Sequence, residues 1–376
     1  MKIVIAPDSY KESLTAMEVA TAIEHGFKQI LPHAEYIKLP MADGGEGTVQ
    51  SLIDATGGEI VKHTVTGPLG EQVEGFYGLL GDGKTAIIEM AAASGLHLVE
   101  PDLRNPLKTT TYGTGELIVA VLERGVEHII IGIGGSATND GGLGMAQALG
   151  IRMLDSSGNQ LGYGGGELNK LATIDMSGLD PRLITTRIEV ACDVDNPLCG
   201  PKGASHVFGP QKGATPEMVR QLDNNLATYA NVIKIQLNKD VKDMSGAGAA
   251  GGLGAALLSL LSAELRPGID IVMDAVNLSN AVANADLVIT GEGRIDSQTI
   301  HGKTPIGVAR MAKKYNCPVI GIAGCLSSDC GIVHNHGIDA VFSVVNKAMD
   351  LTTALEEAAR NIELTSRNIA AVYCIK

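Results

Sequence analysis

Short apolar runs alternate with amphipathic segments at both ends of the chain. The run KIVIA (2–6) predicts a buried strand, and the apolar residues of 14–27 then recur at helical spacing, with Ser13 or Thr15 as the N-cap. A second strand and helix follow at 36–40 and 49–57. Near the C-terminus the same alternation returns, with strands at 285–293, 317–324 and 339–345 and helices at 305–316 and 352–373. Such alternation is typical of a parallel α/β architecture.

The middle of the chain follows another pattern. Residues 59–90 are rich in β-type runs separated by hairpin turns. Strands are predicted at 128–132 and 187–194, and a helix at 215–233 has Thr215 as N-cap and Pro216 at its first position. We therefore predict two α/β domains: a discontinuous Rossmann-like domain with a parallel sheet (1–65 plus 270–376), and a second domain inserted into it (66–269).

The stretch GLLGDGKT (78–85) matches the Walker A phosphate-binding pattern. That motif needs a strand before its first glycine and a helix that begins at its lysine. Here both flanking runs are β-like, and Asp82-Gly83 is typical of a hairpin turn. We favour a hairpin over a phosphate loop.

Three further features are weak as indicators of function. GAGAAG (246–251) fits G-x-G-x-x-G but follows no strand. The uncharged stretch 245–263 predicts a glycine-rich turn and a buried helix in preference to a membrane span. Cysteine and histidine residues at 325–336 match no familiar zinc spacing, so we favour a segment without metal.

Composition and charge narrow the classes of function. The net charge is −13, and aromatic residues make up 3% with no Trp, which argues against nucleic-acid binding. The six Cys show no disulfide-framework spacing. Charges follow the first apolar run at once, which is unlike a signal peptide. We expect a cytoplasmic protein that does not insert into membranes.

The loop GIGGSATNDGG (132–142) carries a stronger signal. It lies between an apolar strand and a helix, and its glycines allow a ligand to approach the backbone closely. Ser136, Thr138 and Asn139 add hydrogen-bond donors, and Asp140 could hold a metal. Binding of phosphate or of nucleotide phosphates is favoured; a dinucleotide site and a plain turn remain alternatives.

Four other loops that follow predicted strands are rich in polar and charged residues. In an open α/β sheet, ligands bind at the carboxyl ends of the strands, where such loops lie. Carboxylates, Lys and Arg alternate in these loops, as phosphoryl transfer requires for binding Mg²⁺, accepting a proton and stabilising negative charge. The loops span residues 6–13, 41–48, 192–214 and 290–305.

With these loops in view, the chain resembles the class I bacterial glycerate kinases over essentially its full length. The resemblance rests on several stretches in this order: KIVIAPDSYKESLTA, LPMADGGEGT, GIGGSATNDGG, ACDVDNPLCGPKGASHVFGPQKGA, GAGAAGGLG and VITGEGRIDSQTIHGKTP. It implies ATP- and Mg²⁺-dependent phosphorylation of D-glycerate to 2-phosphoglycerate. It also implies two α/β domains with the active site in the cleft.

The residue roles are hypotheses. The carboxylate of Asp193 is expected to accept the substrate's hydroxyl proton or to bind Mg²⁺, since it follows a buried strand and precedes an Asn-Pro turn. The remaining catalytic candidates are Asp8, Lys11, Arg294 and Lys303, and Glu292 and Asp296 are further candidate ligands of Mg²⁺. The expected ATP-binding residues are Gly134, Gly135, Ser136, Thr138, Asn139, Asp43, Gly44, Gly45, Glu46, Asn196 and Lys212.

Other functions stay open at this point. The chain could phosphorylate the 3-hydroxyl of glycerate or a related hydroxy acid, or bind a nucleotide or sugar acid without turnover. A dinucleotide oxidoreductase is weaker still, because the loop at 132–142 lacks the immediate helix start of that fold. The sequence does not distinguish a monomer from a homodimer.

Overall fold

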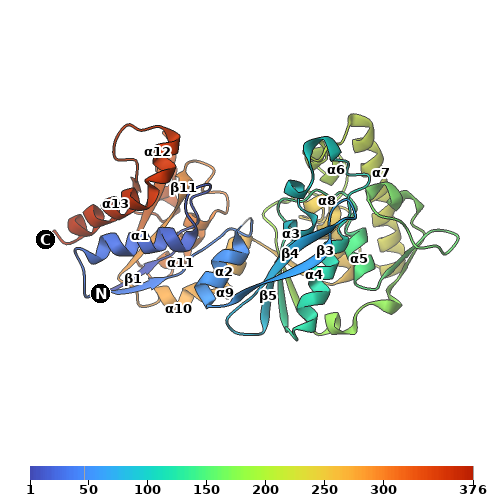
Figure 1. Cartoon of the computed structure of the whole chain (residues 1–376), viewed down its shortest axis with the longest axis horizontal. Coiled ribbons are helices and arrows are strands. Elements are labelled where there is room, and N and C mark those ends of the chain that lie inside the picture. The colour runs from blue at the N-terminus through green and yellow to red at the C-terminus, as the bar shows by residue number, and fades with distance from the viewer. Residues whose placement is uncertain (46, 376) are drawn as a thin grey trace. The chain divides into compact units, whose positions relative to one another are not determined.

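The computed structural model describes residues 1–45 and 47–375. The chain divides into two compact units (Figure 1). The terminal unit comprises Met1–Asp43, Gln50–Gly58 and Pro267–Lys376, and the central unit comprises Gly44–Val49 and Glu59–Arg266.

The terminal unit is built on a five-stranded sheet in which every neighbouring pair of strands is parallel. The order is β13-β12-β11-β1-β2, so the first strand of the chain lies at the fourth position beside a strand from the C-terminal region. This arrangement confirms the predicted parallel α/β architecture. The strands are β1 (Lys2–Ile5), β2 (Glu35–Lys38), β11 (Leu287–Ile295), β12 (Val319–Leu326) and β13 (Ala340–Ser343).

Helices from both chain ends cover this sheet. The predicted N-cap of the first helix is confirmed: Thr15 and Glu18 form a capping box, in which each side chain accepts a hydrogen bond from the other's backbone N–H. The helix predicted over 352–373 is interrupted at Glu357, where the backbone leaves helical geometry with a ψ of 6°. The helices are α1 (Ala16–Lys28), α2 (Thr48–Thr56), α9 (Gly268–Ala275), α10 (Leu278–Val282), α11 (Thr304–Lys313), η7 (Cys330–His336), α12 (Leu351–Glu356) and α13 (Ala358–Tyr373).

The central unit has a six-stranded mixed sheet in the order β10-β9-β6-β5-β4-β3. The first four strands of this order are mutually parallel, and β3 and β4 extend the sheet as antiparallel strands. A small antiparallel pair, β7 with β8, lies apart from it. The strands are β3 (Glu59–Thr66), β4 (Gln72–Leu79), β5 (Thr85–Glu89), β6 (His128–Gly132), β7 (Arg152–Leu154), β8 (Thr173–Asp175), β9 (Arg187–Ala191) and β10 (Glu264–Arg266).

The helices of the central unit vary widely in length. The longest begins as predicted, with Thr215 accepting a hydrogen bond from the Met218 N–H and Pro216 in the first turn. The helices are α3 (Ala91–Ser94), η1 (Leu96–Leu98), η2 (Pro101–Leu103), α4 (Tyr112–Glu123), α5 (Leu143–Ala148), η3 (Gly165–Lys170), η4 (Met176–Gly178), η5 (Pro181–Ile184), α6 (Ala204–Phe208), η6 (Pro210–Lys212), α7 (Pro216–Leu237) and α8 (Ala249–Leu260). Within the described ranges, none of the helices combines the length and apolar character needed to span a bilayer.

The Walker A look-alike forms the predicted hairpin. β4 and β5 are antiparallel, and the Asp82 carboxylate accepts hydrogen bonds from the N–H groups of Lys84 and Thr85. Gly83 has a φ of 67°, as the turn requires. The N–H groups of Lys84 and Thr85, the Lys and Thr of the motif, are thus used in a turn between two strands.

The GAGAAG segment serves as a packing element. Ala250, Gly251 and Gly252 all have positive φ, which kinks the start of α8. The Gly251 carbonyl accepts a hydrogen bond from the Gly141 N–H at 3.0 Å. A Cβ on Gly251 would overlap the Thr138 carbonyl oxygen, so glycine allows the kink to press against the backbone of loop 132–142.

The contact between α1 and α13 offers a test of the terminal core. These helices lie side by side (Figure 1), and a Cβ on Gly26 would overlap the Glu363 carbonyl oxygen and come within 2.7 Å of the Ser366 Cβ. We expect Gly26→Ala to destabilise the terminal unit by about 1–3 kcal/mol, since overpacking forces the helices apart. Thermal unfolding and amide exchange in α1 measure this. His25→Ala, at an exposed neighbour, is the control, and equal stability of both variants would contradict the prediction.

Candidate active site

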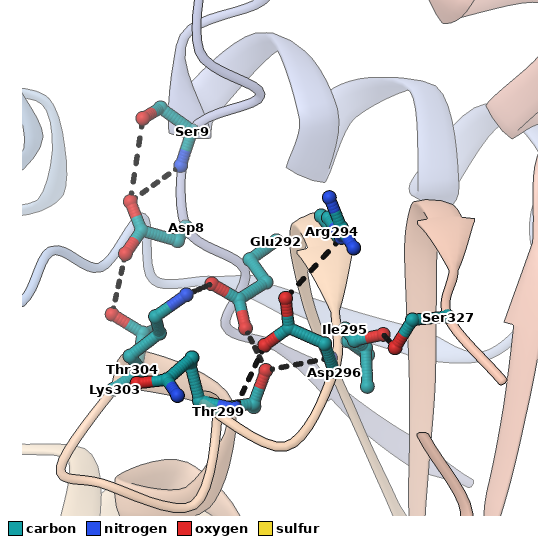
Figure 2. Close-up of polar contacts among 11 residues, drawn as sticks. Asp8, Ser9, Glu292, Arg294, Ile295, Asp296, Thr299, Lys303, Thr304 and Ser327 are labelled. Atoms are coloured by element: carbon teal, nitrogen blue, oxygen red, sulfur yellow. Dashed lines mark hydrogen bonds and ion pairs between the residues drawn. The ribbon is translucent and has the colours of Figure 1, made fainter. Parts of the chain in front are cut away.

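A cluster of charged side chains lies at the carboxyl ends of β1 and β11 in the terminal unit (Figure 2). Asp8 follows β1, and its backbone N–H donates to the Gly291 carbonyl at 2.8 Å, which fixes the loop beside β11. Its carboxylate accepts a hydrogen bond from the Thr304 hydroxyl at 2.6 Å and one from the Ser9 N–H at 2.7 Å. Asp8 is therefore held by residues from three segments.

The environment of Asp8 shifts its ionisation. Burial raises the pKa of Asp8 to about 7, and the negative charges of Asp43 and Glu292 add to the rise, while the hydrogen bond from Thr304 opposes it. A carboxyl group that titrates near neutral pH can both take up and release a proton under physiological conditions. Such perturbed groups are concentrated at functional sites.

Glu292 in β11 is the second buried carboxylate of the cluster. Its Oε1 accepts a hydrogen bond from the Thr299 hydroxyl at 2.6 Å, and its Oε2 lies 3.3 Å from the Lys303 ammonium. Burial raises the pKa of Glu292, and these two partners oppose the rise. Both oxygens therefore already have donors within the unit.

The cations of the cluster differ in exposure. Arg294 Nε lies 3.2 Å from Asp296 Oδ2, yet the Arg294 side chain is 64% exposed and can reach a ligand. The Lys303 side chain is about one-third exposed. Lys11 is exposed, and its backbone N lies 3.7 Å from the position of a Cβ on Gly293. The terminal unit thus gathers Asp8, Lys11, Glu292, Arg294, Asp296 and Lys303, all of them predicted from sequence.

The glycine-rich loop 132–142 of the central unit is held by segment 90–96. The Met90 N–H donates to the Gly132 carbonyl at 2.9 Å, and the Leu96 N–H donates to the Gly135 carbonyl at 2.8 Å. Beside the loop is a cavity of about 380 Å³, lined by Phe76 and by five glycines: Gly44, Gly45, Gly132, Gly134 and Gly135. Gly134 and Gly135 are exposed to it.

Three consecutive backbone N–H groups near the start of this loop are available as hydrogen-bond donors. In the part of the chain that the structure describes, the N–H groups of Gly134, Gly135 and Ser136 donate no hydrogen bond. Gly135 has a φ of 72°, which only glycine adopts readily. Consecutive unpaired N–H groups in such a conformation form an anion-binding concavity.

The side chains of the loop point into the protein. Thr138 and Asn139 are fully buried, and the Asn139 amide donates to the Ser205 hydroxyl at 3.0 Å. The Ser136 hydroxyl accepts a hydrogen bond from Lys212 at 2.8 Å. If these positions contact a ligand as predicted, the contact is therefore made by the backbone of the loop.

Asp140 is a structural residue, which corrects its interpretation as a possible metal ligand. Its carboxylate is fully buried and accepts hydrogen bonds from the N–H and hydroxyl of Thr111 and from the N–H groups of Gly142 and Gly144. Four donors occupy the carboxylate, which ties the loop to α4 and to the start of α5. Sequence reasoning missed Thr111, because 29 positions separate it from Asp140.

The remaining predicted residues differ in where they lie. Asp193 is exposed in the loop after β9, and the Asn196 amide donates to the Lys202 carbonyl within the same loop. Lys212 is 1% exposed. Asp43 belongs to the terminal unit, where its charge acts on Asp8. Glu46 lies outside the described residues.

Three more residues of the two sites were not found from the sequence. Thr299 and Thr304 hold the carboxylates of the terminal cluster, and Glu89 borders the cavity while its Oε1 accepts a hydrogen bond from the Val49 N–H at 2.9 Å. The Thr-Pro pair at 304–305 indicates only a helix start in the sequence. Nothing in the sequence pattern links Thr299, Thr304 and Glu89 to their partners, which lie 7, 296 and 40 positions away.

Comparisons with known proteins show the family to which the chain belongs. The profile of the Glycerate kinase family matches residues 3–374. The chain is 64% identical to a glycerate kinase of Bacillus subtilis (99% of this chain, 97% of that protein) and 63% identical to a glycerate 2-kinase of Escherichia coli (100% and 98%). A crystal structure from Salmonella typhimurium LT2, which carries the name glycerate kinase 2, matches with a TM-score of 0.93 at 62% identity (99% and 98%). The predicted resemblance is confirmed, and the chain belongs to the glycerate kinase family of phosphotransferases.

Proposed function

We propose that this kinase transfers the γ-phosphoryl group of ATP to the 2-hydroxyl of D-glycerate. The product would be 2-phosphoglycerate, in line with the name of the Escherichia coli relative. The observation that carries the proposal is the Asp8 carboxyl group, whose pKa burial raises to about 7, in a cluster at the ends of two parallel strands that also holds the side chains of Arg294 and Lys303. The six cysteines are free thiols, which is in keeping with the reducing cytoplasm.

In this proposal Asp8 is the general base. The substrate's hydroxyl oxygen attacks the γ-phosphorus, its proton passes to Asp8, and the bond from phosphorus to the oxygen of the leaving ADP breaks. A base with a pKa near the working pH serves such a step well. Lys303, Arg294 and Lys11 would hold the glycerate carboxylate or the transferred phosphoryl group, because positive charge must offset the negative charge that spreads in the transition state.

We assign the phosphates of ATP to the loop at Gly134–Ser136. Its three N–H groups have no acceptor among the described residues, and the neighbouring cavity is lined by glycines that leave the backbone accessible. Backbone N–H groups at such loops bind phosphate oxygens in many nucleotide-binding proteins. Gly44 and Gly45, which line the same cavity, would also border the nucleotide.

The carboxylates of the candidate site could supply some of the oxygen ligands that Mg²⁺ needs. Among the described residues, no group of three or more His, Cys, Asp or Glu side chains is arranged to hold a metal by itself. Mg²⁺ in kinases usually takes one or two carboxylates together with substrate phosphates, so such a group is not required. The candidate ligands are Asp193, Glu292 and Asp296. The ion would neutralise charge on the phosphates.

The reaction itself is tested by ³¹P NMR of purified protein with ATP, Mg²⁺ and D-glycerate. We expect the resonance of 2-phosphoglycerate, and its loss when EDTA removes the metal. A 3-phosphoglycerate resonance would contradict the choice of hydroxyl. Absence of any phosphorylated glycerate, with ATP bound, would favour another acceptor or a protein that binds without turnover.

The base is tested by comparing two carboxylate variants. We expect Asp8→Asn to lower kcat by about 10²–10⁴-fold, the usual cost of removing a general base. Asp193→Asn should instead raise the Mg²⁺ concentration needed for half-maximal rate and keep the acidic limb of the kcat–pH profile. If Asp8→Asn keeps kcat within a few-fold while Asp193→Asn loses it, Asp193 is the base.

The ionisation of Asp8 also predicts a pH dependence of stability. Its pKa rises from 3.8 to about 7 on folding, so its contribution to stability is complete below pH 3.8 and is lost as the pH rises through about 7. We expect Asp8→Asn, which carries no charge, to gain in melting temperature over the wild type between pH 5 and pH 8. Glu35→Gln, at an exposed carboxylate of the same unit, should show no such trend. A difference in melting temperature between Asp8→Asn and the wild type that stays constant from pH 5 to pH 8 would contradict the raised pKa of Asp8.

A further inference from the structure

Lys212 is a fully buried lysine beneath the glycine-rich loop. It is the last residue of η6 and is 1% exposed. Its ammonium donates to the Ser136 hydroxyl at 2.8 Å and to the Thr138 carbonyl at 2.6 Å. Both bonds therefore end on the loop whose Gly134 and Gly135 line the cavity.

The ammonium has no carboxylate of its own. Among the described residues, no acidic side chain forms an ion pair with Lys212, and Asp140, whose charge acts on it, is occupied by four other donors. A buried charge is normally paired, because removing it from water is costly. The arrangement leaves positive charge in the protein interior next to Ser136.

The position of Lys212 is imposed by the backbone around it. The next residue, Gly213, has a φ of 88°, and a Cβ there would overlap the Arg104 carbonyl oxygen. The Arg104 guanidinium is directed to the Val99 carbonyl. Main-chain contact thus fixes the end of η6, and the lysine side chain extends from it to the loop.

We infer that Lys212 is a positioning residue that shapes the loop at Gly134–Thr138 and supplies buried positive charge for a polyphosphate bound on its N–H groups. Ser136 connects Lys212 to the proposed phosphate site. Its hydroxyl accepts a hydrogen bond from Lys212, and its N–H is one of the three unpaired N–H groups of the loop. The inference rests on the proposed function, because it takes the triphosphate of ATP as the anion. Lys212 acts through the loop and does not itself touch the ligand.

The ionisation of Lys212 gives the inference a distinctive readout. Burial lowers the pKa of Lys212 to about 7, and the charge of Asp140, from the loop before α5, opposes the change. Tyr229 of α7 faces Asp140, and burial raises its pKa, so it remains protonated over the range of interest. The ammonium is therefore charged below pH 7 and largely neutral at pH 8.5, unless a bound anion keeps it protonated.

The test compares Lys212→Met with wild type by calorimetric titration of ATP. At pH 6 we expect the variant to bind ATP about 10–100-fold more weakly, and at pH 8.5 the ratio should shrink several-fold. KM for D-glycerate should stay within about threefold. Lys239→Met is the matched control, since Lys239 also donates to a carbonyl and a serine hydroxyl in the central unit, and it should bind ATP like the wild type.

Two results would overturn the inference. The first is an ATP affinity of Lys212→Met that stays within threefold of wild type at pH 6. The second is an equal loss of ATP affinity at pH 6 and at pH 8.5, which a purely structural role of Lys212 would give. A wild type that binds ATP but leaves glycerate unphosphorylated would overturn the proposed function alone. A wild type that turns over glycerate beside a Lys212→Met with normal ATP affinity would overturn this inference alone.

A second measurement serves if Lys212→Met does not fold. The Asp8→Asn protein, from which the carboxyl group with a pKa of about 7 has been removed, is titrated with ATP at pH 8 in two buffers of different ionisation enthalpy. ATP is fully ionised there, since its last phosphate pKa lies about one to two units lower. We expect about half a proton to be taken up per ATP bound, and no uptake would contradict the inference.

Discussion

Parallel pairing of strands determines where the polar loops of each unit lie. Because consecutive parallel strands all end at the same edge of a sheet, the loops that follow them gather there whatever their distance in the sequence. In the terminal unit this constraint brings the loop after β1 beside the end of β11, so that Asp8 and Glu292 come together across most of the chain. In the central unit it brings the loop after β6 beside the segment that follows β5.

The charged groups of both candidate sites reduce the stability of the folded state in a similar way. Asp8, Glu292 and Lys212 are charged groups placed where water is partly or wholly excluded, and each therefore has a shifted pKa. None of these shifts favours the folded state at neutral pH. Natural proteins accept such losses at functional sites, and the apolar cores of both units offset them.

Local patterns in the sequence predicted local structure well. The Thr15 capping box, the Thr215-Pro216 helix start and the Asp82-Gly83 turn depend on residues within a few positions of one another, and all three are confirmed. The loops that hold the candidate sites were also found, because their glycines and charges are unusual for plain connections. What could not be predicted are the contacts across the fold: the hydrogen bond from Thr304 to Asp8 spans 296 positions, and the bond from Lys212 to Ser136 spans 76. Such pairs depend on topology, which periodicity and propensity do not specify.

The kink at Ala250–Gly252 has a consequence for how this sequence can vary. The atoms that oppose a side chain at Gly251 belong to the main chain of Thr138 and Asn139, and main-chain atoms are present whatever residues occupy those positions. A substitution at Gly251 therefore has no compensating partner elsewhere in the chain. Its glycine is dictated by contact between two backbones, and a saturation library gains nothing by including it. A string of glycines that resembles a dinucleotide fingerprint can thus reflect a close contact between two backbone segments inside the fold.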